Sequence, residues 1–559
     1  MFGSSVMNEL THWLMLDLRY LGSCDANDAI QISIVQPGQE KLATLSTFQP
    51  EFTYPIFGEE ETIFGYKGLI IRLRFAAHDL RSNVHISYDE KFKTVADVAP
   101  VDLLKTLNPW LPKSSFAPLE DFEESVLNDK FAKDFKPPGK LVHSYTSKQR
   151  NYEIWAGSLT DPEIRTFLDR VQIFVSFFIE GGTPITTDDF EWTLQRWTVY
   201  LIYEKRDPPN PTASPYSFVG YSTTYRWYFY LEDPNNNNKI RQTPKILDTP
   251  FPYTDGISIS QLPARLRISQ FLILQPHQQS GHGSQLYHTI QSACLTDPTL
   301  HELTVEDPNE AFDYLRDIND YHTLYPEFLK HKISINPNPY QPDDQAQQGA
   351  PRRRRPRLMP TSALLPTTTL RDLRTRYKIA PVQFSHIVEM YLLSQIPADH
   401  RGASNTNIAR LLVQKWRAPN EHDRRYYWWR MLVKQRLYKR HRDLLIQLDR
   451  EERLQKLEET LGNVEEGYDG LLKAFGVKRG GGQRGGKEGG DEVEGEKDGE
   501  GEGENGDVEG SGSWERGKRK FTVLEDEDEE GEDGGGEGKD GEDRPTDGEE
   551  VPSAKKMKT

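Results

Sequence analysis

A glycine-containing turn at residues 278–284 holds the residues of this chain that are best suited to chemistry. The turn follows an apolar, strand-forming run ending in Phe271-Leu-Ile-Leu274 and precedes a segment with helical periodicity. Glycine lets the backbone pass close to a ligand, and unpaired N–H groups at a helix start attract an anion. A pyrophosphate would fit there. Because Gln278-x-x-Gly281-x-Gly283 lacks the spacing of the Rossmann and Walker loops, it is also compatible with an ordinary strand-to-helix turn.

Two acidic residues follow the next predicted strand. The run Thr304-Val-Glu-Asp-Pro308 comes about one helix beyond the turn, so the unit is strand, turn, helix and strand, with Glu306 and Asp307 where the second strand ends. A carboxylate at this position can act as a general base. The alternative is that one of these acids caps a helix beginning at Pro308, because Asp followed by Pro is a common helix start.

This unit resembles the acetyl-CoA site of the GNAT acetyltransferases, and its surroundings resemble one family, the type B histone acetyltransferase catalytic subunits. The segments that carry the resemblance are Phe48-Gln-Pro50, Tyr54-Pro-Ile-Phe-Gly-Glu-Glu-Glu-Thr62, Phe64-Gly-Tyr-Lys-Gly68 and Val305-Glu-Asp-Pro-Asn-Glu-Ala-Phe312. Lys378-Ile-Ala-Pro381 and the helical stretch after it resemble the C-terminal part of the fungal members. The resemblance spans roughly residues 25–330, whereas the first 24 residues and the acidic tail carry none.

The resemblance implies direct acetyl transfer from acetyl-CoA to a lysine side chain in a ternary complex. A lysine ammonium has a pKa of ~10.4, so forming the free amine near neutral pH costs about 4 kcal/mol. A base must therefore take the proton, and the resemblance assigns this role to Glu306, with Asp307 and Glu180 assisting. An acyl-cysteine route is disfavoured because Cys294 falls in an apolar helix, where a buried structural thiol is expected.

The resemblance also implies where coenzyme A lies. Its thioester would face backbone N–H groups at a splayed strand edge formed by Phe271, Leu272 and Ile273, with the pyrophosphate on the backbone of Gln278, Gln279, Ser280, Gly281, His282, Gly283 and Ser284. Asn309 and Phe312 are expected along the pantetheine, although Phe312 fits a core position equally well. No metal is expected, because neither Cys24 nor Cys294 has metal-ligand spacing. Two distant cysteines also argue against a disulfide framework.

A basic histone tail needs acidic and aromatic partners. Two segments match the regions through which the family holds the histone H4 tail: the loop residues Glu59, Glu60 and Glu61, and the strand residues Tyr225, Arg226 and Trp227. The alternatives are a solvated loop and a core strand. Arg226 departs from an acidic groove, which leaves its role there open.

Charge separates the chain into a near-neutral body and an acidic tail. From Arg479 onward there are 27 acidic and 13 basic residues, a net charge of −14 within a total of −17. The Gly/Glu/Asp-rich composition of this tract, together with the low mean hydropathy of −0.72 for the whole chain, predicts that the tract is disordered. A body without a basic stripe argues against direct DNA binding. No apolar run reaches the length of a membrane span.

The predicted fold class is α+β: a GNAT core with a mixed central sheet flanked by helices, a mainly β N-terminal domain, a helical C-terminal region and a disordered acidic tail. Strands are expected at residues 30–35, 69–75, 193–203, 217–231 and 266–274, and helices at 101–107, 120–131 and 162–181. The expected segments are an N-terminal extension (1–24), an α+β domain contributing to histone binding (25–155), the catalytic domain (156–332), a Pro/Gln/Arg-rich linker (333–360), the helical region (361–477) and the tail (478–559).

Near its end the helical region has an apolar seam at 3,4 spacing. It comprises Leu454, Leu457, Leu461, Val464, Tyr468 and Leu471. Such a seam either docks a partner helix or folds back on its own domain, and we expect the latter because glycines at 462, 467 and 470 weaken a free coiled coil.

The expected function is acetylation of lysines in the N-terminal tail of newly made histone H4, linked to chromatin assembly. The resemblance further implies a WD-repeat histone-binding chaperone as partner. Basic clusters at residues 352–357, 518–520 and 552–558 are candidate import signals, so cytoplasm and nucleus are both expected. Two rival functions are a GNAT enzyme with another amine acceptor and a non-catalytic histone chaperone.

Overall fold

The computed structural model describes residues 22–94, 98–207, 212–228, 263–339, 359–401 and 418–481, with side chains up to residue 476. These residues belong to one compact unit, and a second unit begins at Glu504, outside the described residues. Most of the predicted N-terminal extension, nearly all of the acidic tail and the three candidate import signals also lie outside the described residues.

The N-terminal part is built on a four-stranded sheet in the order β3-β2-β6-β7. The strands are β2 (Ile30–Pro37), β3 (Leu42–Phe48), β6 (Ile70–Ala76) and β7 (Ser82–Ser87), with β2 and β6 parallel. Alternate residues of β2 and β6, including Ile30, Ile32, Ile71 and Leu73, enter the core. Helices α4 (Leu103–Leu107) and α5 (Leu119–Leu127) match the predicted helical patches. Strands make up most of the regular structure between residues 22 and 94.

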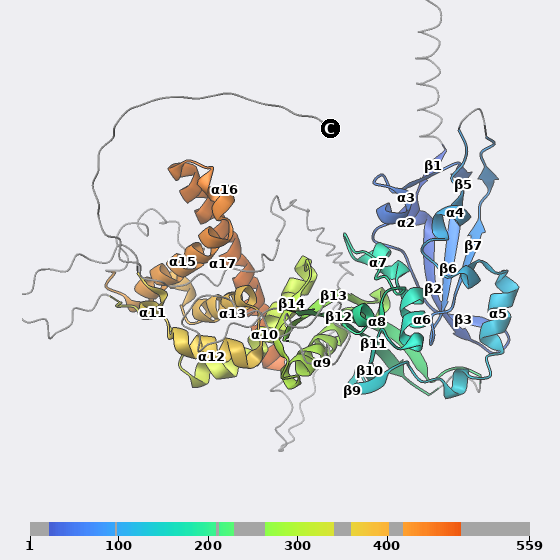
Figure 1. Cartoon of the computed structure of the whole chain (residues 1–559). Helices are drawn as coiled ribbons and strands as arrows, with labels where there is room; N and C mark the ends of the chain where they lie inside the picture. Colours follow the sequence, from blue (N-terminus) through green and yellow to red (C-terminus); the bar gives the residue numbers. More distant parts are fainter. Residues whose placement is uncertain are drawn as a thin grey trace, which may run out of the picture. The chain divides into compact units, whose positions relative to one another are not determined.

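The second sheet has six strands in the order β14-β13-β12-β11-β10-β9 (Figure 1). They are β9 (Lys140–Ser147), β10 (Arg150–Ser158), β11 (Trp197–Lys205), β12 (Tyr216–Tyr228), β13 (Ala264–Ile273) and β14 (Leu300–Val305). All neighbours are antiparallel except β13 and β14, which run parallel. The second sheet is therefore mixed, as predicted.

The structure corrects two boundaries. A division between residues 155 and 156 falls inside β10, which pairs with β11 along most of its length, so β9 and β10 belong to the second sheet. The strand predicted from residue 193 starts only at Trp197, because α8 (Glu191–Leu194) precedes it. Aromatic and β-branched composition identified the strand, while the helical turn at its start was missed.

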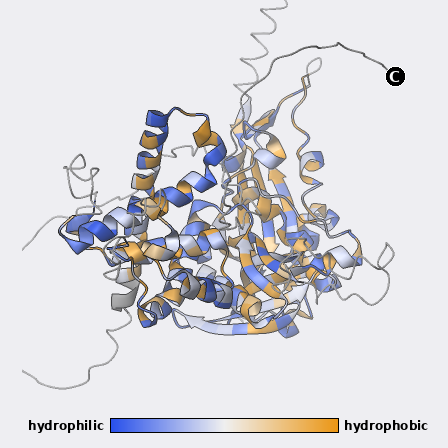
Figure 2. Ribbon diagram, turned by 60° about the vertical axis from the view of Figure 1, so that its left-hand side comes forward, coloured by the Kyte–Doolittle hydropathy of each residue, from blue (hydrophilic) through white to orange (hydrophobic). Residues whose placement is uncertain are grey.

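Alternating side chains give the six-stranded sheet two apolar faces. On one face, Tyr200 and Ile202 pack in a cluster with residues of α9 (His282–Thr296). On the other, Val199 and Leu201 join α6 (Pro162–Val171), α7 (Ile173–Phe178) and the N-terminal sheet in a larger core. Figure 2 shows hydrophobic residues along the strands and mixed hydrophobic and hydrophilic stretches on the helices. The sheet is thus covered on both sides, which holds its strand ends in place.

The C-terminal helices form their own core. They are α10 (Glu310–Lys330), α11 (Thr361–Leu364), α12 (Thr367–Tyr377), α13 (Pro381–Ser394), α15 (Glu421–Arg440), α16 (Arg442–Ile446) and α17 (Arg450–Gly481). From the predicted seam, Leu461, Tyr468 and Leu471 are buried in this core and Leu457 and Val464 pack against it, so folding back is confirmed. Leu454 is the exception, being 54% exposed. None of the helices in the described ranges is long and apolar enough to cross a membrane.

Candidate active site

Strands β13 and β14 separate at one side of the second sheet, where β14 is the edge strand. Their pairing ends at Ile268 and Val305, whereas β13 stays paired with β12 as far as Ile273. The backbone N–H of Gln270 donates to Thr223 Oγ1 at 3.1 Å and that of Leu274 to Val219 O at 3.0 Å, both on the β12 side. Because successive residues of a strand alternate in direction, the N–H of Phe271 points to the open edge. The splayed edge expected from the resemblance is present.

Glu306 lies at the point where the two strands part. Its backbone N–H donates to Ile268 O at 2.8 Å, which fixes the chain directly after β14. The Ser269 hydroxyl donates to Oε2 at 2.6 Å, and the Tyr225 hydroxyl donates to Oε1 at 3.3 Å. Burial, followed by the charge of Glu306, raises the pKa of Tyr225, so the phenol remains a donor. The half-buried carboxylate is oriented by two hydroxyl groups and can accept a proton.

The helix after Glu306 begins later than the capping alternative requires. Asp307 is exposed, with a φ of +36°, and α10 begins at Glu310 instead of Pro308. The helix is capped by Asn309, whose side chain accepts from Phe312 N at 2.9 Å. The alternative in which Glu306 or Asp307 caps a helix at Pro308 is therefore wrong. The sequence signal for this helix start was Asn309 itself, since Asn is among the preferred N-cap residues.

Glu180 is exposed in the loop after α7, and two contacts hold this loop. The N–H of Gly181 donates to the Tyr54 hydroxyl at 2.7 Å, and Gln270 Nε2 donates to Thr183 O at 2.9 Å. Gln270 is buried in β13 next to Ser269, which contacts Glu306. Sequence reasoning missed Ser269 and Gln270; the detectable signal was a pair of polar residues within an apolar strand.

The glycine turn has the predicted strand, turn and helix order. Residues 275–277 form a short 3₁₀ turn, Gln279 and Gly281 have positive φ angles of 55° and 86°, and α9 begins at His282. The first helical hydrogen bond runs from Gln285 N to Gly281 O, so the N–H groups of the first turn have no intrahelical acceptor. A Cβ on Gly281 would meet open space, whereas one on Gly283 would lie 2.6 Å from Leu315 Cδ1. Gly281 thus allows the positive φ angle of the turn. Gly283 allows α9 to pack closely against α10.

The two apolar residues of this site mainly pack. Leu272 is buried in the core beneath the sheet, and by the same alternation its backbone faces β12, with which it is paired. Phe312 is half-buried, with its ring centroid 4.9 Å from that of Phe271 and 6.3 Å from that of Tyr287. Phe312 therefore packs beside the strand that is expected to hold the thioester.

His282 is a packing residue whose backbone belongs to the turn. Its side chain is 2% exposed, with Nδ1 2.8 Å from the Tyr145 hydroxyl and its ring 4.3 Å from that of Tyr152. Burial lowers the pKa of His282 to about 4. The side chain is therefore neutral at physiological pH and shares a hydrogen bond with the Tyr145 hydroxyl.

This depressed pKa predicts an acid-sensitive turn. Between pH 6.5 and 4 the unfolded chain protonates at His282 while the folded protein does not, so folded stability falls as pH drops through this window and is independent of this group above it. We expect a larger drop in Tm from pH 7 to pH 5 for wild type than for His282→Asn. An imidazole NMR titration giving a pKa near 6.5 would contradict the prediction. Because burial also lowers the pKa of His277 to about 4, part of the pH dependence should persist in the variant.

The three glutamates of the acidic loop separate into two kinds. Glu59 and Glu60 are exposed. The Glu61 carboxylate accepts from Thr53 N at 2.5 Å and Tyr54 N at 3.1 Å, at the start of α3 (Tyr54–Phe57), and from Asn27 Nδ2 at 3.1 Å. Glu61 therefore anchors a helix start, and Glu59 and Glu60 are the two glutamates accessible to a basic peptide.

The aromatic strand places its predicted residues on opposite faces. The ring of Tyr225 lies 6.2 Å from that of Trp227, which is 37% exposed. Arg226, on the other face, donates to Thr299 Oγ1 at 2.9 Å and pairs with Asp297 before β14. The question left by Arg226 is thus answered structurally: it ties β12 to the end of α9, away from the two aromatic rings.

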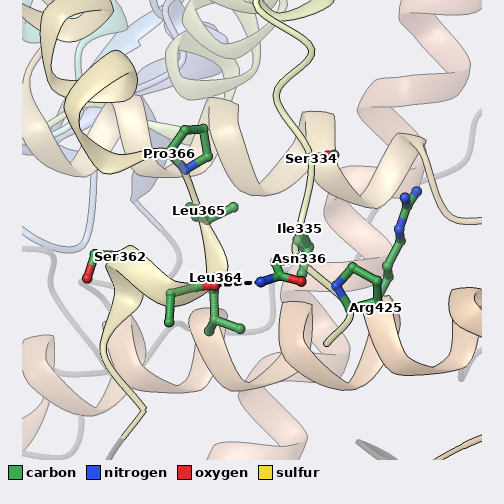
Figure 3. A pocket seen from close by; sticks show the side chains of 10 residues that line it. Ser334, Ile335, Asn336, Ser362, Leu364, Leu365, Pro366 and Arg425 are labelled. Carbon is green, nitrogen blue, oxygen red and sulfur yellow. Dashed lines mark hydrogen bonds between the residues drawn. The ribbon is translucent and has the colours of Figure 1, made fainter. Parts of the chain in front are cut away.

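Cys294 is 1% exposed, and burial raises the pKa of its thiol to about 12, as expected for a structural cysteine. Within the described ranges, no three His, Cys, Asp or Glu side chains are grouped as metal ligands. A cavity of about 330 Å³ opens elsewhere, among residues 334–337, 362–366 and Arg425 of the C-terminal region (Figure 3). None of the predicted site residues lines it.

Known proteins match this chain over most of its length. The family described as "Histone acetyl transferase HAT1 N-terminus" matches residues 22–180. The histone acetyltransferase type B catalytic subunit of Aspergillus fumigatus is 58% identical, over 93% of this chain and 87% of the relative. The same subunit of Aspergillus oryzae is 61% identical over 81% and 86%, and that of Neurospora crassa 38% over 80% and 87%. The chain belongs to the type B histone acetyltransferase catalytic subunits and is an acyltransferase.

Proposed function

We propose that this enzyme transfers acetyl from acetyl-CoA directly to lysine side chains in the N-terminal tail of newly synthesised histone H4, in connection with chromatin assembly. The observation that carries the proposal is the position of Glu306, held by Ser269 and Tyr225 where β13 and β14 part. A base at a splayed strand edge, next to a turn with unpaired N–H groups, suits acyl transfer from a phosphate-bearing thioester. The architecture and these elements support a GNAT type of core.

Glu306 takes a proton from the lysine ammonium. The neutral amine then attacks the thioester carbon, the new C–N bond forms, the C–S bond breaks and coenzyme A leaves as a thiolate. The acylated nitrogen gives its second proton to this thiolate, so the products are the neutral amide and the thiol of coenzyme A. A thiol pKa near ~8.5 makes the thiolate an adequate leaving group without a dedicated general acid. The Phe271 N–H at the open edge can donate to the oxygen that gains charge during attack. Asp307 and Glu180 are proposed to assist deprotonation from the flanking loops.

The acceptor is proposed from charge and aromatic surface. Glu59 and Glu60 offer exposed carboxylates, and Tyr225 and Trp227 share one face of β12 next to Glu306. These groups suit a flexible basic peptide, whereas a small amine would use few of them. A WD-repeat histone-binding chaperone is the proposed partner, the proposed locations are cytoplasm and nucleus, and direct DNA binding is not proposed.

The test measures transfer of radiolabelled acetyl to an H4 tail peptide, with a small amine as competitor. We expect the peptide to be acetylated and the amine to compete weakly. Efficient competition would favour a GNAT enzyme with another acceptor. Binding of the peptide without transfer would favour a histone chaperone.

A further inference from the structure

The hairpin between β9 and β10 contacts the glycine turn at residues 278–284. Its turn residues Lys148 and Gln149 have φ angles of 47° and 64°, an arrangement typical of a tight two-residue hairpin. The Ser147 hydroxyl donates to Ser280 O at 3.2 Å, and Lys148 Nζ donates to Ser280 Oγ at 3.2 Å. The hairpin tip therefore brings an ammonium group to the turn at residues 278–284.

The strand leading to this tip is anchored on α9. On the same face of β9 as Ser147, the Tyr145 hydroxyl lies 2.8 Å from His282 Nδ1, and His143 Nε2 lies 3.1 Å from Gln285 Oε1. Three alternate residues of β9 thus contact the glycine turn and the first turn of α9. Because the strand is held at several points, the position of Lys148 is a property of the fold and does not depend on its own side-chain contact.

The electrostatics at this position favour an anion. Lys148 is exposed, and no carboxylate of the described residues lies within salt-bridge distance of its Nζ. The start of α9 carries the positive end of the helix dipole and unpaired N–H groups. A cation held against that end is unfavourable unless a negative group lies between them. Open space above Gly281 leaves room for such a group.

We propose that Lys148 binds the diphosphate of the acetyl-CoA cosubstrate from the β9–β10 hairpin, opposite the N–H groups of the turn. This rests on the proposed function, which places the cosubstrate on residues 278–284. A lysine acts on a phosphate as a mobile point charge, so arginine should replace it well. Lys148 is thus a cosubstrate-binding residue outside the turn itself, and its effect should appear in the KM for acetyl-CoA and leave kcat nearly unchanged.

The test compares Lys148→Ala, Lys148→Arg and a matched control, Lys140→Ala, at the other, exposed end of β9. Loss of one charge-assisted phosphate contact is expected to raise the KM for acetyl-CoA roughly 10-fold in Lys148→Ala. Lys148→Arg and Lys140→Ala should stay near wild type. Acetyl-dephospho-CoA, which keeps the diphosphate, should show the same penalty, whereas S-acetylpantetheine, which has no phosphate, should show none. Calorimetric titration with coenzyme A should show a similar rise in Kd for Lys148→Ala.

Several results would overturn the proposal. An unchanged KM for acetyl-CoA and an unchanged Kd for coenzyme A in Lys148→Ala would show that Lys148 does not bind the diphosphate. An equal rise in KM with S-acetylpantetheine, which has no phosphate, would show that Lys148 only stabilises the turn at residues 278–284. A penalty seen with acetyl-CoA but absent with the dephospho compound would move the contact to the 3′-phosphate. If wild type binds coenzyme A but transfers nothing, a calorimetric loss in Lys148→Ala still supports the proposal while the proposed function fails. If wild type binds no coenzyme A, both fail.

Discussion

Replacing Glu306 with glutamine is expected to lower kcat for acetyl transfer to an H4 tail peptide by about 10²- to 10⁴-fold at pH 7. The amide keeps the volume of the carboxylate and can still accept from Ser269 or Tyr225, but it cannot take a proton. Activity should partly recover as the pH rises from 6 toward 10, because the lysine, with a pKa of ~10.4, increasingly deprotonates without help. The measurement is the pH dependence of kcat for wild type and variant.

Three variants separate the base from its surroundings. Ser269→Ala removes one orienting hydroxyl and should cost much less than Glu306→Gln, with no recovery at high pH. Asp307→Asn and Glu180→Gln test the two assisting acids, both of which are exposed. Full activity in Glu306→Gln would transfer the role of base to one of these acids. The variant showing the alkaline recovery would then identify it.

Replacing Glu389 with alanine is expected to destabilise the C-terminal helical core by about 3–5 kcal/mol. Both oxygens of Glu389 are bound by the Arg436 guanidinium, at 2.8 and 2.9 Å, and the Tyr468 hydroxyl donates to Oε2 at 2.9 Å. These groups join α13, α15 and α17, and removal of the carboxylate leaves a largely buried cation unpaired. Hydrogen exchange should show lost protection in these three helices, with protection of β11 and β12 retained.

A surface ion pair on α17 provides the control. Lys456 contacts Glu459 at 3.4 Å, with the two side chains 46% and 51% exposed. Glu459→Ala should cost no more than about 1 kcal/mol, because solvent screens the pair. In the double variant Glu389→Ala/Arg436→Met, stability should partly return, since no unpaired charge remains. Retained protection in Glu389→Ala would show that water reaches Arg436.

Local patterns in the sequence were sufficient for several parts of the site. The strand, glycine turn and helix at residues 271–296 were predictable because a change from period 2 to period 3.6, with glycine between, leaves few other structures. Cys294 was predicted as buried from the apolar residues around it. All six seam residues of α17 were predicted to fold back, and five of them do, while Leu454 is exposed.

Side-chain partners were not predictable in the same way. Glu61 follows two exposed glutamates of identical type, and only its proximity to the backbone of Thr53 and Tyr54 makes it a helix anchor. Arg226 sits between two aromatic residues in the sequence, but strand alternation turns it toward Asp297. Both cases depend on which distant segment lies on a given side, and periodicity carries no such information.

The sequence by itself determined the α+β class, the order of the catalytic unit, the acid at the end of β14 and the division into a near-neutral body and an acidic tail. These follow from local periodicity, turn residues and charge, together with a close family resemblance. The tertiary structure decided where β13 and β14 separate, that Ser269 and Tyr225 hold Glu306, and that the β9–β10 hairpin brings Lys148 to the glycine turn. The reason is physical: strand separation and these contacts arise from the packing of segments 37 to 132 residues apart in the chain, which local patterns do not encode.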